Sequence, residues 1–171
     1  MNAESRRSAI LSRLAASDAP MSATALAGEF SVSRQIIVGD IALLRAAGET
    51  ISATPRGYVL QKERAGLVKA VAVVHTQGQT EEELYIMVDN GCTVLDVVVE
   101  HPIYGQMTGQ LQLSSRYDVS QFIERLRNEG GEPLSALTGG IHLHTLQCPD
   151  EGAYERTRAG LRAAGMLLET D

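Results

Sequence analysis

The sequence predicts an α+β protein of two domains, a small helical unit ending in a hairpin and then an open-faced sandwich of sheet and helices. Apolar residues keep a helical period through most of the first 60 positions and alternate between strand and helix patterns thereafter. The balance of charged residues also differs between the two regions. Residues 1–65 hold eight Lys and Arg against six Asp and Glu, and residues 66–171 hold seven against fifteen. A polar stretch ending in glycine, residues 61–66, separates the two regions. We therefore expect domains at 1–62 and 66–171.

Bulk composition excludes several classes of protein. A hydrophobic content of 44% permits a core, which must be aliphatic because the chain has no Trp and two Phe. The apolar stretches are too short and too interrupted by charge for a transmembrane helix, and the N-terminus lacks the apolar segment of a signal peptide. Cys92 and Cys148 are too few for a disulfide framework and lack the spacing of a metal knuckle. We expect a cytoplasmic protein with no membrane partner.

The first domain is predicted to be a winged helix. Asn2 and Ser5 are cap candidates for the first helix, Ser22 precedes the second, and the turn at 31–33 caps the third, which stops at Gly48. Two short strands joined by Pro55 and Arg56 then form a hairpin. The expected elements are helices at about residues 5–17, 23–30 and 33–47 and strands at 51–54 and 57–60.

The third helix has the surface of a helix that reads a DNA groove. Ile37, Ile41 and Leu44 share one narrow sector and must face the core. The opposite sector is small in its middle and basic along one edge, which lets the helix axis approach base edges. An ordinary surface helix would favour Lys, Glu and Gln, and a winged helix can also bind proteins, but the arginines favour DNA. The candidate DNA-binding residues are Ser33, Arg34, Gln35, Val38, Gly39, Arg45 and Arg56, with Ala42 in the same sector.

The second domain is predicted to follow the order β-α-β-β-α-β-α, with helices on one side of an antiparallel-rich sheet. In the common sheet orders for this topology the first and last strands are neighbours, which is a fold-level expectation. The expected strands are 67–74, 94–99, 107–113 and 141–146, and the expected helices are 80–89, 119–127 and 151–164. Residues 100–102 are expected to interrupt the second strand.

Three of the four histidines lie on the two strands expected to pair. His142 and His144 are two residues apart, so both rings project from one face, and His75 ends the neighbouring strand. A helix beginning soon after it carries three consecutive carboxylates, 81–83. Three imidazoles and a carboxylate suit Zn²⁺ or Ni²⁺. Paired strand histidines are as often hydrogen-bonded surface residues, so spacing leaves both interpretations open.

Both halves resemble the niacin-responsive transcriptional repressors. In the first domain the similarity is carried by LAGEFSVSRQIIVGDIALLRAAG and ISATPRGYVL. In the second domain EELYIMVDNG, DVVVEHPIYGQ and LTGGIHLHTL resemble, in the same order, the ligand-sensing domain named for its three histidines. One departure is Gly39, where that family is expected to have Gln. A base-reading side chain is lost there, so the operator can differ.

The resemblance implies specific partners. It implies metal ligands at His75, Glu83, His142 and His144, a homodimer on double-stranded operator DNA, and nicotinic acid as the effector. The effector is expected to strengthen repression of niacin transport and NAD biosynthesis genes. The remaining candidates for effector binding are His101 and Tyr104, in a turn that either lines the pocket or only ends a strand, and Arg116 as a partner for the carboxylate.

Two rival functions follow from the same residues. A metal on three histidines with a nearby glutamate can activate water, so a metal-dependent hydrolase fused to a winged helix is one alternative. The chain has no HExxH motif, glycine-rich phosphate loop or nucleophile elbow, and we therefore do not expect an enzyme. The other alternative is a metal-responsive regulator without an organic effector.

Overall fold

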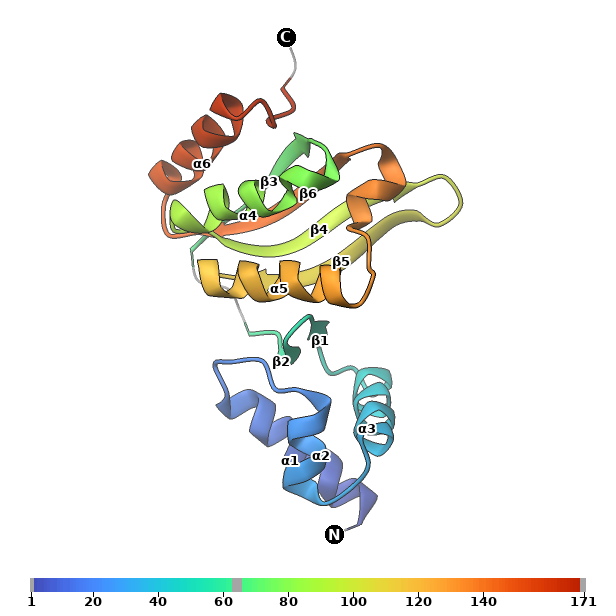
Figure 1. Ribbon diagram of the computed structural model, residues 1–171. Coiled ribbons are helices and arrows are strands. Elements are labelled where there is room, and N and C mark those ends of the chain that lie inside the picture. Colours follow the sequence, from blue (N-terminus) through green and yellow to red (C-terminus); the bar gives the residue numbers. More distant parts are fainter. Residues whose placement is uncertain (1, 63–65, 170–171) are drawn as a thin grey trace. The chain divides into compact units, whose positions relative to one another are not determined.

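The computed structural model describes residues 2–62 and 66–169, and the chain divides between residues 64 and 65 into two compact units. The predicted boundary at 61–66 lies partly outside the described residues, because 63–65 are not among them. The predicted α+β class is confirmed: a helical unit with a hairpin precedes a unit with a four-stranded sheet (Figure 1). Within the described ranges, no helix is long and apolar enough to cross a membrane.

The first unit has three helices and a two-stranded hairpin. Each helix follows a residue whose side chain accepts a backbone hydrogen bond from the first turn, and these residues are Asn2, Ser22 and Ser33. The caps satisfy amide groups that have no partner inside the helix. Because Asn2 rather than Ser5 is the first cap, the first helix starts two residues earlier than predicted. The elements are α1 (Ala3–Ala16), α2 (Ala23–Phe30), α3 (Arg34–Ala46), β1 (Ile51–Thr54) and β2 (Gly57–Leu60).

The first unit is held together by an aliphatic core and by an ion pair at the buried Asp40. Ile37, Ile41 and Leu44 of α3 are buried as predicted. Asp40 lies on the same helix and is only 4% exposed. It accepts a hydrogen bond of 2.6 Å from the Arg6 Nε, which ties α1 to α3.

The second unit follows the predicted element order. Its sheet is antiparallel with the order β3-β6-β4-β5, so the first and last strands are neighbours, as expected from the topology. The elements are β3 (Leu67–Val74), α4 (Thr80–Asp89), β4 (Thr93–His101), β5 (Gly105–Leu113), α5 (Arg116–Asn128), β6 (Ile141–Cys148) and α6 (Glu151–Ala163). Two short 3-10 helices, η1 (Gln77–Gln79) and η2 (Leu134–Thr138), lie in the connections.

Strand register places the histidines of β6 on the covered face of the sheet. His142 pairs with Val73 and His144 pairs with Val71. All four are buried, whereas Ile141 and Leu143 on the opposite face are exposed. The alternation of side chains along a strand therefore turns both histidines toward the packed helices.

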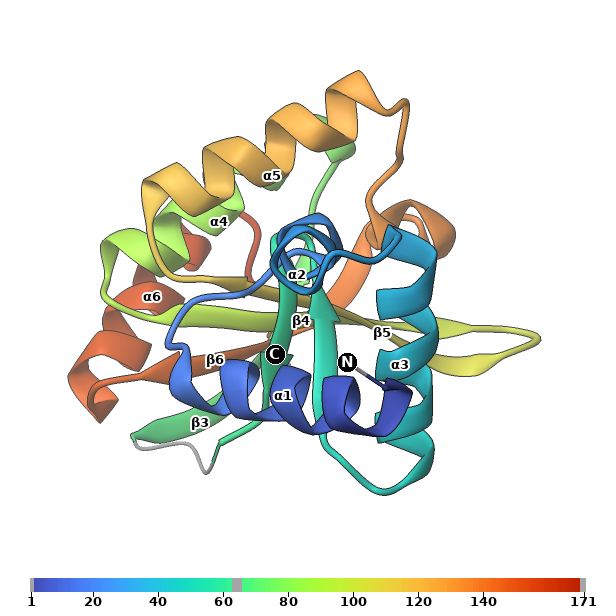
Figure 2. The ribbon, with the colours of Figure 1, turned by 90° about the horizontal axis from the view of Figure 1, so that it is seen from below.

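The β4–β5 hairpin is longer than predicted and extends beyond the helices (Figure 2). The sequence suggested that residues 100–102 interrupt β4, but pairing continues to His101 opposite Gly105. Pro102 lies in the turn itself, where its missing amide hydrogen removes no ladder bond.

The two cysteines are joined by a disulfide that the sequence analysis did not predict. Cys92 and Cys148 are both 1% exposed and 56 residues apart in sequence. They meet because Thr93 of β4 pairs with Gln147 of β6, which sets the flanking cysteines side by side. A pairing that depends on register between distant strands cannot be recognised from cysteine count or spacing.

Candidate functional site

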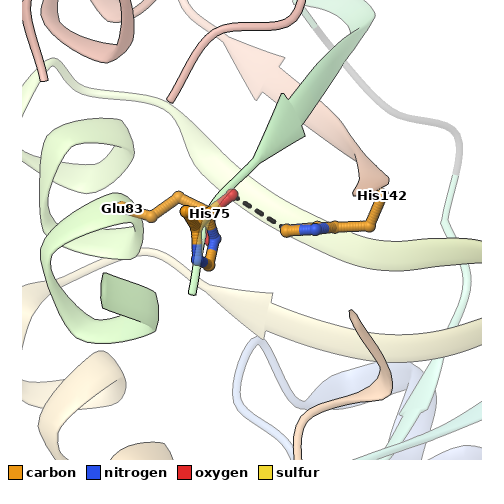
Figure 3. Close-up of side chains that lie close together, drawn as sticks. All are labelled: His75, Glu83 and His142. Atoms are coloured by element: carbon orange, nitrogen blue, oxygen red, sulfur yellow. Dashed lines mark hydrogen bonds and ion pairs between the residues drawn. The ribbon is translucent and has the colours of Figure 1, made fainter. Parts of the chain in front are cut away.

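Four buried polar side chains converge on the covered face of the sheet. The Oε2 atom of Glu83 lies 2.6 Å from His75 Nε2. Its Oε1 atom lies 3.0 Å from His142 Nε2 and 3.2 Å from His144 Nε2. Figure 3 shows Glu83 reaching from α4 toward His75 at the end of β3 and His142 on β6. We call these four residues the histidine cluster; they are the residues that the family resemblance implied as metal ligands.

The helix α4 selects one of three consecutive carboxylates. Glu83 is 0% exposed and lies on the same side of α4 as the core residues Leu84 and Met87. Glu82 is exposed, and Glu81 accepts hydrogen bonds from Tyr85 and Arg127 away from the cluster. Spacing could not distinguish among them, because the choice depends on how α4 rotates against the sheet.

A close backbone approach completes this arrangement. Gly140, just before β6, has a φ of +100°, and a Cβ atom there would clash with the carbonyl oxygen of His75. Glycine is therefore required at Gly140 for the strand carrying His142 to start beside His75.

The three imidazole rings share one hydrogen-bonding pattern, in which Nδ1 contacts a backbone carbonyl. The Nδ1 atom of His75 lies 2.7 Å from the Thr76 carbonyl oxygen. That of His142 lies 2.8 Å from the Gly140 oxygen, and that of His144 lies 2.7 Å from the Asp96 oxygen. A carbonyl oxygen can only accept, so each Nδ1 carries a proton, and each ring points its Nε2 atom toward the Glu83 carboxylate.

With the Nδ1 protons directed at carbonyl groups, the buried Glu83 carboxylate needs a positive charge near the Nε2 atoms. If the rings are neutral, the imidazoles and the carboxylate face one another with lone pairs only; among the described residues, the His144 Nε2 atom has no hydrogen-bond partner of acceptable geometry. Protonating all three rings would instead bury two excess positive charges. The ligand atoms of His75, Glu83 and His142 lie within 4.8 Å of one another, close enough to share one divalent cation, and Nδ1–carbonyl bonds are the usual support of metal-binding histidines. The residues present therefore fit a metal ion.

Electrostatics within the cluster favours an ionised glutamate. Burial alone would raise the pKa of Glu83, but its charge interaction with His144 and its close contacts with the three histidines lower it well below its ordinary value. Burial likewise opposes charging of His75 and His144, yet the hydrogen bonds and charge of Glu83 raise the pKa of both rings. The cluster thus attracts positive charge, whether carried by protons or by a metal.

A surface pocket of about 420 Å³ adjoins the cluster. His75 contributes to both, and the remaining lining groups are backbone, hydroxyl, amide and aliphatic groups. The lining residues are Val74, His75, Thr76, Gln77, Gln79, Ser135, Ala136, Gly139 and Gly140. We call this the His75 pocket.

The other candidates for effector binding lie away from this pocket. His101 is at the tip of the β4–β5 hairpin, where its Nδ1 accepts hydrogen bonds from the Ile103 and Tyr104 amides. Tyr104 is 76% exposed. Arg116 donates two hydrogen bonds to Asp89 at the other end of α4. Among the described residues, none of these three candidates lines the His75 pocket.

The candidate DNA-binding residues have different environments. Arg34, Gln35 and Gly39 are exposed on α3, whereas Val38 is half-buried against the core. Ser33 caps α3 through its side chain.

Two arginines of that set lie toward the hairpin. Arg45 donates a 2.7 Å hydrogen bond to the Ile51 carbonyl and lies over the Tyr58 ring, so it connects α3 to the hairpin. Arg56 occupies the turn between β1 and β2 and is partly buried.

The sequence analysis missed two exposed apolar residues on α3. Ile36 is 42% exposed and Leu43 is 55% exposed. Both flank the sector of small residues on the side opposite Arg34 and Arg45. The helical wheel contains this signal, because neither residue falls within the core sector of α3.

Comparison with known proteins assigns each unit to a domain family. An HTH domain model matches residues 6–59, and a 3H domain model matches residues 68–170. The chain is 45% identical over 166 residues to the "Probable transcription repressor NiaR" of Thermotoga maritima, covering 97% of this chain and 95% of that one. It is 40% identical over 168 residues to the "Transcription repressor NadR" of Bacillus subtilis, covering 96% and 93%. The chain therefore belongs to the NiaR/NadR family of transcription repressors, DNA-binding regulators with an HTH and a 3H domain, and is not an enzyme.

Proposed function

We propose that this repressor senses nicotinic acid beside a divalent metal ion and represses genes of niacin transport and NAD biosynthesis. The observation that carries the proposal is the histidine cluster, in which three oriented imidazoles surround a buried carboxylate inside a 3H domain. In this proposal the protein acts as a homodimer on operator DNA in the cytoplasm.

His75, Glu83, His142 and His144 are the proposed metal ligands. Imidazole nitrogens with one carboxylate suit Zn²⁺ or Ni²⁺ among the common divalent ions. When bound, the metal supplies a Lewis-acid position for a pyridine nitrogen or a carboxylate. The chain's part is to orient the three rings through their Nδ1–carbonyl bonds and to hold Glu83 ionised in the core.

The His75 pocket is the proposed effector site. Its volume of about 420 Å³ falls within the range of small-molecule sites. Among the described residues, its lining contains hydroxyl and amide groups but no Lys or Arg. A carboxylate entering it would therefore find its positive partner at the metal, and the proposal does not require Arg116.

The first unit is proposed to contact DNA through α3 and the hairpin. Arg34 and Gln35 are exposed at the start of α3, the end of a recognition helix that enters the major groove. Arg56 lies in the hairpin turn, where a wing meets phosphate or the minor groove. In a two-fold dimer, two such helices contact half-sites about 10 base pairs apart or a multiple of that distance.

A titration tests the sensing step. Purified protein is loaded with one metal, and operator affinity is measured against increasing nicotinate, with nicotinamide as the matched neutral ligand. We expect nicotinate to strengthen operator binding and nicotinamide to do so less, because it lacks the carboxylate. Unchanged DNA affinity at saturating nicotinate would refute the sensor and favour a regulator that responds to metal alone.

A variant pair locates the response. His142→Ala combined with His144→Ala should abolish metal binding and the response to nicotinate, while leaving the winged helix folded. His101→Ala is the matched control, because His101 lies at the hairpin tip outside the cluster. A response that survives the double substitution would place the effector elsewhere.

A further inference from the structure

The exposed surface of α3 has two chemically different flanks. One flank carries Arg34 and Arg45, and the other carries Ile36 and Leu43, which are 42% and 55% exposed. Ile36 and Leu43 are seven residues apart, close to two helical turns, so they lie on one side of the helix. Between the flanks are Gln35, Gly39, Ala42 and Ala46. All of α3 is among the described residues.

Little of this surface can form hydrogen bonds to bases. Base edges in the major groove are recognised by amide, guanidinium, ammonium, carboxylate and hydroxyl groups. On α3, Arg45 donates its Nε hydrogen to the Ile51 carbonyl and lies over Tyr58, so its guanidinium is turned toward the hairpin. Arg34 and Gln35 are left near the N-terminal end. The apolar flank can recognise one feature of the major groove, the C5-methyl group of thymine.

Gly39 supports a close approach of this helix to its partner. Its φ is not in the left-handed region, and a Cβ atom there would meet nothing within 4 Å. The domain's own packing therefore does not require glycine, although glycine inside a helix lowers stability relative to alanine. In an HTH domain, a missing side chain at the centre of the exposed face of α3 lets the helix enter the groove more deeply. Ile36 and Leu43 are then brought nearer to the bases.

We propose that Ile36 and Leu43 are specificity-determining residues that recognise thymine methyl groups in each operator half-site. This inference rests on the DNA-binding part of the proposed function and is independent of niacin sensing. Seven residues span about 10 Å along a helix axis, which corresponds to about three base-pair steps of 3.4 Å. Each half-site should therefore contain two important thymines about three steps apart.

Methyl removal tests the proposal directly. Duplexes are selected from a random library by the full-length protein, and each thymidine of the selected site is replaced in turn by deoxyuridine, which lacks only the methyl group. We expect two positions per half-site at which binding weakens about fourfold, since one buried methyl group contributes roughly that factor. A half-site with no thymine, or one insensitive to every replacement, would overturn the proposal.

Protein variants assign each methyl group to a side chain. Leu43→Ala should bind the thymine duplex more weakly than the unsubstituted protein does. On the duplex with deoxyuridine at the partner position of Leu43, the variant and the unsubstituted protein should bind equally. Ile36→Ala should behave in the same way at the other position. Gln35→Ala should instead lose equal affinity on both duplexes. Leu137→Ala, an exposed leucine of the second unit, is the matched control.

Three outcomes separate the alternatives. Equal losses by Leu43→Ala on both duplexes would refute methyl recognition while leaving DNA binding intact. A shift of that variant's sedimentation toward monomer, with no methyl dependence, would instead assign the apolar flank to a second copy of the chain. Failure to select any duplex would overturn this inference together with DNA binding by the first unit. Gln35, Ile36 and Leu43 are exposed on α3 and Leu137 is exposed in the second unit, and circular dichroism and thermal melting of each variant check that the protein is folded.

Discussion

The two units of this repressor use polar and apolar groups in opposite ways. In the first unit the core is aliphatic, and the residues proposed for function lie on the exposed side of one helix, α3. In the second unit the exposed face of the sheet carries apolar Leu143, whereas the candidate site is buried among core residues. A surface site can be built from consecutive residues of one element. A buried polar site needs partners from several elements, because each desolvated group must be satisfied.

The buried carboxylates of the two units also differ in whether an arginine is paired with them. Asp40 in the first unit is paired directly with Arg6, so its charge is balanced by the protein itself. Glu83 in the second unit faces three rings whose Nδ1 protons are already committed to carbonyls. The first arrangement is a structural ion pair, and the second is the proposed metal site. The predictions below test this difference, from the largest expected effect to the smallest.

Reduction of the disulfide should give the largest change in stability. Cys92 and Cys148 are 56 residues apart, and the disulfide between them restricts the unfolded chain. Reduction restores the conformational entropy of the unfolded state, which predicts a destabilisation of about 4 kcal/mol. Urea unfolding with and without a thiol reductant measures this, and alkylation of the unfolded, unreduced protein should find no free thiol. Both cysteines lie in the second unit, so hydrogen exchange in residues 2–62 should not change. Equal acceleration in both units would show that they unfold together.

Metal removal should have the next largest effect. At a free ion concentration 100 times the Kd, a metal that binds only the folded state stabilises it by about 3 kcal/mol, and chelation should remove this increment. The measurement is the thermal midpoint of the full chain with added Zn²⁺ or Ni²⁺ and after chelation. The variant with His142→Ala and His144→Ala should melt at the same temperature under both conditions. A metal-dependent shift that persists in this variant would place the ion outside the cluster.

Breaking the Arg6–Asp40 ion pair of the first unit should lower the free energy of unfolding by a smaller amount. Asp40→Ala leaves Arg6 partly buried without its partner and should destabilise the first unit by about 1–3 kcal/mol. Glu29→Ala, which breaks an exposed pair with Arg13, should cost about 1 kcal/mol or less. Urea unfolding measures both changes. Metal affinity should be unaltered by either variant, and a weaker metal affinity in Asp40→Ala would contradict the separation of the two units.

The smallest change should be a gain. Gly39→Ala should stabilise the first unit by about 0.5–1 kcal/mol, because the helix loses a glycine and the new methyl group meets no neighbour. The same substitution should weaken operator binding if α3 approaches DNA closely at this position. Thermal melting and a DNA-binding titration of one preparation measure both. Higher stability with unchanged operator affinity would mean that DNA does not approach Gly39 closely.

Local patterns predicted most of the secondary structure. Helical and strand periods placed the elements of both units within a few residues, since side-chain periodicity directly reflects which face of an element is buried. The pairing of β3 with β6 came from topology, and with the spacing of His142 and His144 it brought three histidines together. The resemblance to the niacin-responsive repressors then selected Glu83, which spacing could not.

Other features depended on contacts between distant segments. The rotation of α4 decided that Glu83, rather than Glu82, is buried. The register of β4 against β6 joined Cys92 to Cys148, and packing of α3 on the hairpin engaged Arg45 with Ile51. Sequence periodicity does not predict these contacts, because each depends on how two elements are placed relative to each other.

The order of elements, the aliphatic cores and the residue types of both candidate sites can be read from the chain, because periodicity and chemistry are properties of neighbouring residues. Tertiary structure decided which groups are desolvated together. That distinction matters most at the histidine cluster, where the Nδ1–carbonyl bonds turn the Nε2 atoms of three histidines toward Glu83. It matters equally on α3, where the packing of the domain leaves Ile36 and Leu43 outside the core.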